Sequence, residues 1–290
     1  MKPYQKGTAL VILSAIVFGL NPFFARSVYA NGGNAWTLTF LSKAIGVPAL
    51  FLMRRLSGSQ SVPLDRTSLK KLLICSLGCA AAPVLLYSSY PYISSGMATT
   101  LHFTYPAIVI VSCSLFFRER LTVRQRFCCA LCMAGILCFY TPGGDSGGLG
   151  IFLALSSGLA YAFYVVYLSK SGLQSIPSLQ LVPWLFLFTA VEVLAVSGIT
   201  GQLDFGLTAA GWAMALLFSI LHACVATVAF QMGAKYIGAQ SASLLSTFEP
   251  LTSVLVGVML FQEPFSPRDA VGAGCILVSV VLLSCGHKRE

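Results

Sequence analysis

The sequence predicts an all-α integral membrane protein with ten transmembrane helices, arranged as two inverted repeats of five helices. Three observations carry this prediction. The first is composition: 57% of the 290 residues are hydrophobic and only 9% are charged, whereas a soluble domain carries about 25% charged residues. The second is the length of the apolar runs, which reach the ~20 residues that a helix needs to cross a bilayer. The third is an internal repeat, described below.

Ten apolar segments follow one another along the chain and are joined by short loops. They are 7–28, 34–54, 69–90, 93–117, 122–140, 148–169, 178–200, 208–232, 236–261 and 267–286. Helices are expected because an open sheet would leave its edge amides without partners in hydrocarbon, and a β-barrel would show alternation over strand-length segments. We expect the first segment to be retained rather than cleaved as a signal peptide, since it is longer than the usual run of about 7–15 apolar residues.

Charge predicts orientation. The net charge of +9 comes from basic residues in short loops rather than from one basic face, so no binding of nucleic acid is expected. With the N-terminus inside, Arg268 is the one basic residue in the loops on the opposite side of the membrane. The positive-inside rule therefore predicts a multi-pass protein of the cell (plasma) membrane with both termini in the cytoplasm.

The sequence indicates no cofactor. Most of the ten cysteines lie within the apolar segments, where a free thiol behaves as a small hydrophobe. Cys129 and Cys132 have C-x-x-C spacing, but no second pair completes a metal site. A glycine-rich phosphate loop is also missing, so ATP hydrolysis is not expected to drive the protein.

A shift of 144 residues aligns the second half of the chain with the first without a gap. The aligned identities are Tyr92 and Tyr236, Ile93 and Ile237, Ala98 and Ala242, Leu101 and Leu245, Pro106 and Pro250, Phe117 and Phe261, Glu119 and Glu263, and Arg124 and Arg268. We expect a first half at 1–140, a linker rich in turn formers at 141–147 and a second half at 148–290. Because five is odd, the second half would enter the membrane upside down. Inverted repeats of this kind build many secondary transporters, with the substrate site near the midplane.

Prolines near the middle of three segments predict helix breaks. They are Pro22, Pro106 and Pro250. A proline has no N–H, so the carbonyl four residues earlier loses its helical partner; for Pro106 and Pro250 these are the carbonyls of His102 and Ser246. At membrane depth such breaks are tolerated where protein or a water-filled cavity satisfies the backbone. We therefore expect bends that surround a polar interior.

Polar residues within the apolar segments are the candidate site. A carboxylate such as Glu249 costs about 2.5–3.5 kcal/mol in mid-membrane, so it should face the interior, either as a functional group or in a structural hydrogen bond between helices. Lys43 and His222 would be functional or would neutralise Glu249, whereas Arg26 and Glu192 are expected to extend toward the interface. The candidate substrate-binding or proton-coupling residues are Glu249, His102, Tyr105, Lys43, His222, Asn21 and Tyr164.

The paired halves, the positions of Pro106 and Pro250, and the segments FFRERLTVRQ (116–125) and FQEPFSPRD (261–269) resemble the drug/metabolite transporter superfamily, more narrowly its EamA-type permeases with two repeats. The resemblance implies a ten-helix bundle that alternates between inward-open and outward-open states and moves small organic solutes, often amino acids, out of the cell. The acidic residue that recurs in the family after the fourth and ninth helices matches Glu119 and Glu263, which we interpret as structural or gating positions. Tyr105 stands where the second half has Glu249, so a coupling site would be asymmetric.

We therefore predict a secondary transporter that exports a small organic metabolite, such as an amino acid or related zwitterion, by alternating access. Glu249 would recognise charge or couple protons, His102 and Tyr105 would donate or accept hydrogen bonds, and Lys43 would bind an anionic group. The expected partners are this substrate, the lipid bilayer and protons; a monomer and a homodimer both remain open. A lipid-linked sugar flippase and a non-transporting subunit of a membrane complex are the alternatives. An enzyme is not expected, because motifs such as H-E-x-x-H and G-x-S-x-G are missing.

Overall fold

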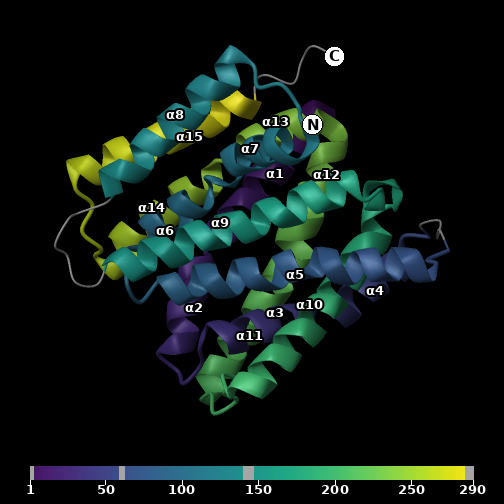
Figure 1. Cartoon of the computed structure of the whole chain (residues 1–290). Helices are drawn as coiled ribbons and strands as arrows, with labels where there is room; N and C mark the ends of the chain where they lie inside the picture. Colours follow the sequence, from purple (N-terminus) through teal and green to yellow (C-terminus); the bar gives the residue numbers. More distant parts are fainter. Residues whose placement is uncertain (1–2, 59–62, 140–146, 285–290) are drawn as a thin grey trace.

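The protein is a bundle of helices, several of which lie side by side along most of their length (Figure 1). The computed structural model describes residues 3–58, 63–139 and 147–284, and every regular element in these ranges is helical. The first part holds α1 (Pro3–Gly19), α2 (Asn21–Tyr29), α3 (Ala35–Ala44), α4 (Gly46–Leu56), α5 (Arg66–Ser89), α6 (Ser95–His102), α7 (Tyr105–Phe117) and α8 (Val123–Phe139). The second part holds α9 (Gly147–Lys170), a 3-10 turn (Leu173–Ser175), α10 (Ser178–Thr200), α11 (Ala209–Ile220), a π-helical turn (Leu221–Ala226), α12 (Thr227–Ile237), α13 (Ala239–Leu245), α14 (Phe248–Phe261) and α15 (Pro267–Ser284).

Eight stretches of the described chain are long and apolar enough to cross a membrane, and α14 is a shorter apolar helix. The eight are Pro3–Tyr29, Ala35–Leu56, Arg66–Ser89, Ser95–Phe117, Gly147–Lys170, Ser178–Thr200, Ala209–Ile237 and Pro267–Ser284. Of the ten predicted segments, the other two correspond to α8 and to α13 with α14. The all-helical, multi-pass character is thus confirmed. The linker predicted at 141–147 lies, apart from Gly147, outside the described residues.

Short polar side chains in the loops cap the N-termini of two helices. Asn34 accepts the Thr37 N–H at 2.9 Å before α3, and Asp65 accepts the Ser68 N–H at 2.9 Å before α5. Such caps satisfy N–H groups that have no partner within the helix. The hydrogen bonds from Ser68 also hold the pKa of the Asp65 carboxyl below its ordinary value.

Several membrane-length stretches are two helices with a break between them. Pro22 is the second residue of α2, Pro106 the second of α7 and Pro250 the third of α14. In the first turn a proline costs no hydrogen bond, because that N–H has no helical partner. A further break, between Ala44 and Gly46, precedes Pro48 and was not predicted.

The expected free carbonyl at Ser246 was wrong. The N–H of Glu249 donates to this carbonyl at 3.0 Å. The chain tightens locally into an i to i+3 hydrogen bond, which replaces the bond that Pro250 cannot donate.

The first helix of each half packs against the other half of the chain. Gly7 on α1 lies against Tyr236 and Ile237, and Gly150 on α9 lies against Tyr92 and Ile93. A Cβ atom on Gly7 would be 2.6 Å from the Cβ of Tyr236, and one on Gly150 would be 2.8 Å from the Cβ of Tyr92. Small residues let helix backbones approach closely in a membrane protein. Tyr92 and Ile93 are equivalent to Tyr236 and Ile237 in the sequence repeat, and the two glycines are 143 residues apart, one short of the repeat shift.

Replacement of Gly150 by leucine should therefore destabilise the protein, because overpacking costs about 1–3 kcal/mol. The same change at Gly148 is the matched control, because Gly148 lies two residues earlier on α9 and a Cβ added there would meet no atom within 4 Å. Thermal unfolding in detergent measures the effect. Equal melting temperatures for the two variants would contradict the close contact between α9 and the Tyr92–Ile93 segment.

Candidate functional site

Aromatic rings surround the break between α6 and α7. The ring of His102 lies 5.3 Å from that of Tyr161, and the rings of Tyr105 and Tyr161 are 4.6 Å apart, centroid to centroid. His102 is buried, and its Nδ1 is 2.6 Å from the hydroxyl of Ser157 on α9. Tyr164 extends this group, with its ring 5.4 Å from that of Tyr161. The structure thus brings His102, Tyr105 and Tyr164 together on one side of the interior.

Glu249 faces this group from the first turn of α14. The phenol groups of Tyr105 and Tyr161 lie within electrostatic range of its carboxyl, as do those of Tyr87 and Tyr90 at the end of α5. Within the described residues the carboxyl of Glu249 has no ion pair and no hydrogen bond from a side chain. A carboxylate inside a membrane protein is expensive unless paired, and the described residues offer this one no cationic partner.

Lys43 lies at the break between α3 and α4. Its side chain is buried, with 8% of the residue exposed, and its Nζ lies 4.2 Å from the centroid of the Phe186 ring. Cys79 and His222 are within electrostatic range. In the part of the chain that the structure describes, the Lys43 ammonium has neither a carboxylate partner nor a hydrogen-bond acceptor. This ammonium therefore lies in the last turn of α3, just before the break that precedes Pro48.

His222 lies in the π-helical turn between α11 and α12. Its ring packs against Phe18 at 5.1 Å and Phe218 at 5.4 Å, centroid to centroid. Its Nδ1 is buried and has no hydrogen-bond partner among the described residues. Single π turns in α-helices frequently occur at functional sites, and an unpaired ring nitrogen is available to a ligand or water.

Aromatic side chains connect the region around Glu249 with the region around Lys43. The rings of Tyr87 and Phe218 are 6.3 Å apart, and Phe218 in turn contacts His222. On the other side, Cys79 is within electrostatic range of both Lys43 and Tyr161. The path from Glu249 to Lys43 therefore runs through aromatic side chains. Among the described residues, no ion pair joins Glu249 to Lys43 or to His222.

Asn21 lies at the break between α1 and α2, next to the start of α14. It is buried, with 7% exposed, and its Oδ1 has no hydrogen-bond partner in the described ranges. Gly19, two residues earlier, packs against the Glu249 carbonyl and Thr252. The breaks before Pro22 and Pro250 are thus in contact, and the amide of Asn21 is close to the Glu249 region.

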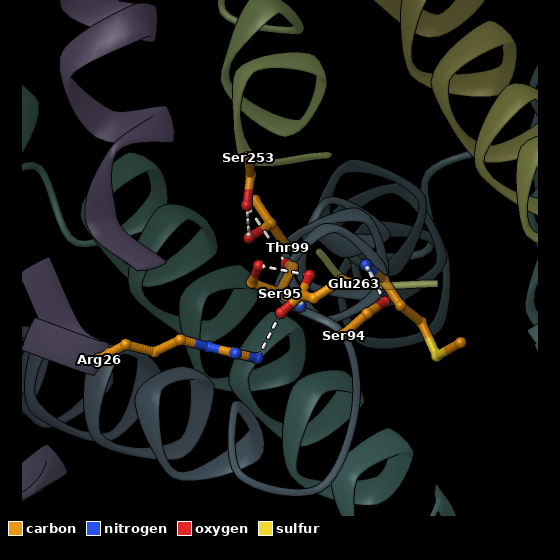
Figure 2. Close-up of polar contacts among 7 residues, drawn as sticks. Arg26, Ser94, Ser95, Thr99, Ser253 and Glu263 are labelled. Carbon is orange, nitrogen blue, oxygen red and sulfur yellow. Dashed lines mark hydrogen bonds and ion pairs between the residues drawn. The ribbon is translucent and has the colours of Figure 1, made fainter. Parts of the chain in front are cut away.

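Arg26 has a partner that the sequence analysis did not name. Figure 2 shows its guanidinium reaching Glu263, with Nη2 bonded to the carboxylate Oε1. The second oxygen, Oε2, accepts the Ser95 N–H at 2.9 Å and the Ser95 hydroxyl at 2.8 Å. Only 8% of the Glu263 side chain is exposed, so a cation is needed to compensate its charge. Ser253 on α14 adds a hydrogen bond to the Ser95 carbonyl at 3.2 Å.

Two other acidic residues also have partners that the sequence analysis did not name. The Oε1 atom of Glu192 accepts a hydrogen bond from the hydroxyl of Ser76 at 2.6 Å. Glu119 pairs with Lys170 at 2.6 Å rather than with the neighbouring arginines. The sequence signal that was available for Glu119 and Glu263 was their equivalence in the repeat.

Comparison with known proteins decides the family. The model of the EamA-like transporter family matches the chain twice, over residues 5–141 and 148–285. The chain belongs to the EamA-like transporter family. The uncharacterized inner membrane transporter YicL of Salmonella typhimurium is 24% identical, over 99% of this chain and 97% of its own length. The uncharacterized transporter sll1319 of Synechocystis sp. is 25% identical, over 96% of this chain and 93% of its own length.

A solved structure described as a crystal structure of a protein shares the fold of this EamA-like chain. Its TM-score is 0.65 at 16% sequence identity, and the match covers 98% of this chain and 99% of the other. The family, the names of the relatives and the apolar helices together support a multi-pass membrane transporter and point away from an enzyme. The resemblance noted from the sequence is confirmed.

Proposed function

We propose that this protein is a secondary transporter that exports a small organic metabolite with both charge signs, such as an amino acid or related zwitterion, across the plasma membrane. One observation carries the proposal: Lys43, which is buried, and Glu249, which is half-buried, are opposite in charge and adjoin the same group of aromatic side chains, and neither pairs with the other or with any other described side chain. An ion inside a membrane protein that lacks a partner marks a substrate or ion path. A zwitterion would supply both partners at once.

The residues have distinct roles in this proposal. Glu249 binds the ammonium group of the substrate, and the surrounding tyrosine rings add cation–π attraction. Lys43 binds the carboxylate through a charge-assisted hydrogen bond, with His222 beside it. The hydrogen-bonding groups are His102, Tyr105 and Asn21, and Tyr164 completes the wall. When no substrate is bound, Glu249 takes up a proton, which couples transport to the proton gradient.

Alternating access would use the symmetry of the chain. We propose ten spans in two inverted halves, 1–140 and 148–290, joined by 141–147, with both termini in the cytoplasm. The contacts of Gly7 with Tyr236 and of Gly150 with Tyr92 support this arrangement, because the two tyrosines are equivalent in the repeat and each contacts a glycine on the first helix of the other half. The breaks before Pro22, Pro106 and Pro250 lie where the halves meet and would absorb the movement.

Counterflow in proteoliposomes tests the function. Vesicles loaded with a single unlabelled amino acid, taken in turn from a neutral zwitterionic panel, should accumulate the labelled form of that amino acid. Matched amines and carboxylic acids of the same size, which carry one charge, should exchange much more slowly. Exchange of these singly charged analogues at the same rate as the amino acids would contradict the two-charge site. Scrambling of a lipid-linked sugar without amino-acid exchange would favour the flippase, and no exchange of either kind would favour a subunit role.

Ligand binding gives a second measurement that does not depend on vesicles. A ligand that binds only the folded state stabilises it by about 2.7 kcal/mol at a hundredfold excess over its dissociation constant. The same panel should therefore raise the melting temperature of the purified protein, with the zwitterions ahead of the amines and acids. An identical response to all three classes would contradict the proposed recognition.

A further inference from the structure

The two ion pairs of the described chain occupy equivalent positions in the repeat. Glu119 and Glu263 are separated by 144 residues, and so are their partners, Arg26 and Lys170. In each pair the cation comes from the last turn of the first membrane-length stretch of one half, and the acid follows the fourth stretch of the other half. We call Arg26 with Glu263 the Glu263 latch, and Lys170 with Glu119 the Glu119 latch.

The surroundings of the two latches match as well. The guanidinium of Arg26 lies 4.7 Å from the centroid of Phe261, and the ammonium of Lys170 lies 4.9 Å from that of Phe117. Phe117 and Phe261 are equivalent in the repeat. Each cation is therefore held by a carboxylate and a ring, and the sequence preserves this arrangement in both halves.

The backbone that presents each acid is also the same. Arg118 and Gln262, directly before the acids, have φ of 56° and 51° and are the positive-φ residues other than glycine in the described chain. The N–H of Glu119 donates to the Cys113 carbonyl at 3.4 Å, and that of Glu263 to the Gly257 carbonyl at 3.0 Å. This left-handed end turns the acid back toward the helix that it closes. A non-glycine residue keeps such a conformation at a cost, and conformations of this kind cluster at functional positions.

The latches lie at opposite ends of the bundle. Glu263 binds Ser95, and Ile93, two residues before Ser95, packs against Gly150 near the start of α9. Lys170 is the last residue of α9. At ~1.5 Å per residue, the helix between Gly150 and Lys170 is about 30 Å long, which is the thickness of the hydrocarbon core. Figure 1 shows α9 running across the bundle between these ends.

We propose that the two latches close the two ends of the transport path. Each ion pair breaks when the path opens at that end of the bundle. The inference rests on the proposed alternating access and adds the residues that hold each end shut. Each latch joins one half of the chain to the other, so movement between the halves must stretch or break it. The Glu263 latch is the more deeply buried, with 8% of the acid exposed against 52% for Glu119, and has the added bonds from Ser95. It should hold its end more firmly.

The test follows access to the interior from each side of the membrane and needs no substrate. Cys79, beside Lys43, is kept as the reporter and the other cysteines are replaced by alanine. A small, charged, membrane-impermeant thiosulfonate is applied to right-side-out and to inside-out vesicles. Glu263→Gln should raise the rate of Cys79 modification from the extracellular side about tenfold. The reason is that loss of one strong charge-assisted interaction increases the population of molecules open at that end by about this factor. Glu119→Gln should do so from the cytoplasmic side.

Three variants separate a latch from a general loss of structure. The double exchange Arg26→Glu with Glu263→Arg should return the modification rate toward that of the parent. Arg120→Gln removes an exposed cation next to Glu119 that makes no ion pair among the described residues, and it should change neither side. Faster modification from both sides in a single latch variant would indicate unfolding and overturn the proposal, as would unchanged rates.

The result is independent of the substrate proposal. Opposite, side-specific effects of Glu263→Gln and Glu119→Gln without any amino-acid exchange would keep the latches and overturn the substrate class. Intact exchange with no side-specific effect would keep the proposed function and overturn the latches.

Discussion

Replacement of Glu249 by glutamine is expected to lower kcat/KM for exchange of a zwitterionic amino acid about 30-fold or more and to remove its dependence on pH. Truncating one side of a buried charge pair costs about 2–5 kcal/mol, and at ~1.4 kcal/mol per factor of ten the lower figure gives the 30-fold change. Glutamine keeps the size and hydrogen-bonding capacity of the side chain but cannot ionise, so it neither compensates an ammonium group nor exchanges a proton. Initial rates of counterflow at several pH values measure both effects.

The same substitution should raise the melting temperature of the ligand-free protein. An ionisable group without a partner in the interior destabilises the folded state, and functional sites commonly sacrifice stability in this way. Glu192→Gln is the matched control, because the Glu192 carboxyl accepts a hydrogen bond from Ser76 and has no interaction with Glu249 among the described residues. It should leave exchange within about twofold, the range expected for a change outside the site. A Glu249→Gln protein that is less stable but transports normally at all pH values would show that the carboxyl is structural.

The broad architecture was accessible from the sequence because lipid imposes simple requirements. The predicted segment 178–200 coincides with α10, and 34–54 differs by one or two residues at each end from the stretch Ala35–Leu56. Hydrophobic length alone is enough for these helices, since every backbone group must be paired within the segment. It was insufficient for 208–232, which continues to Ile237, because the residues at that end are less apolar and packing decides where the helix stops.

Helix breaks were only partly accessible. Pro48 stands three residues after a break, whereas Pro83 and Pro183 lie inside continuous helices. A proline removes one hydrogen bond in each case, but neighbouring helices determine whether the chain bends or separates. The position of Lys43 at a break therefore could not be derived from the position of the proline.

The ion pairs were hidden by sequence distance. Arg26 and Glu263 are 237 residues apart, and each, taken by itself, is a charged residue near the end of an apolar segment. Such residues usually extend to water, so this was the expectation for Arg26. The repeat held the missing information: once Lys170 is bonded to Glu119, the same shift of 144 residues points from Arg26 to Glu263.

Replacement of Lys43 by methionine is expected to have the second large effect, and one that differs in kind from that of Glu249→Gln. The carboxylate of a zwitterion would lose its cation, so KM should rise about 30-fold by the same loss of about 2 kcal/mol, while an amine of equal size without a carboxylate should bind as it does to the parent. Methionine fills the volume beside Phe186 without a charge, so the ligand-free protein should melt at a higher temperature.

Lys43→Arg keeps the charge and is the conservative control, which should retain part of the exchange activity. If Lys43→Met weakened amines and zwitterions equally, or lowered the melting temperature with exchange unchanged, Lys43 would support the fold beside Phe186 and would not bind the anionic group. The pair of variants thus tests each end of the interior separately: Glu249→Gln should remove the preference for an ammonium group and Lys43→Met the preference for a carboxylate, a reciprocal pattern that one neutral pocket cannot produce.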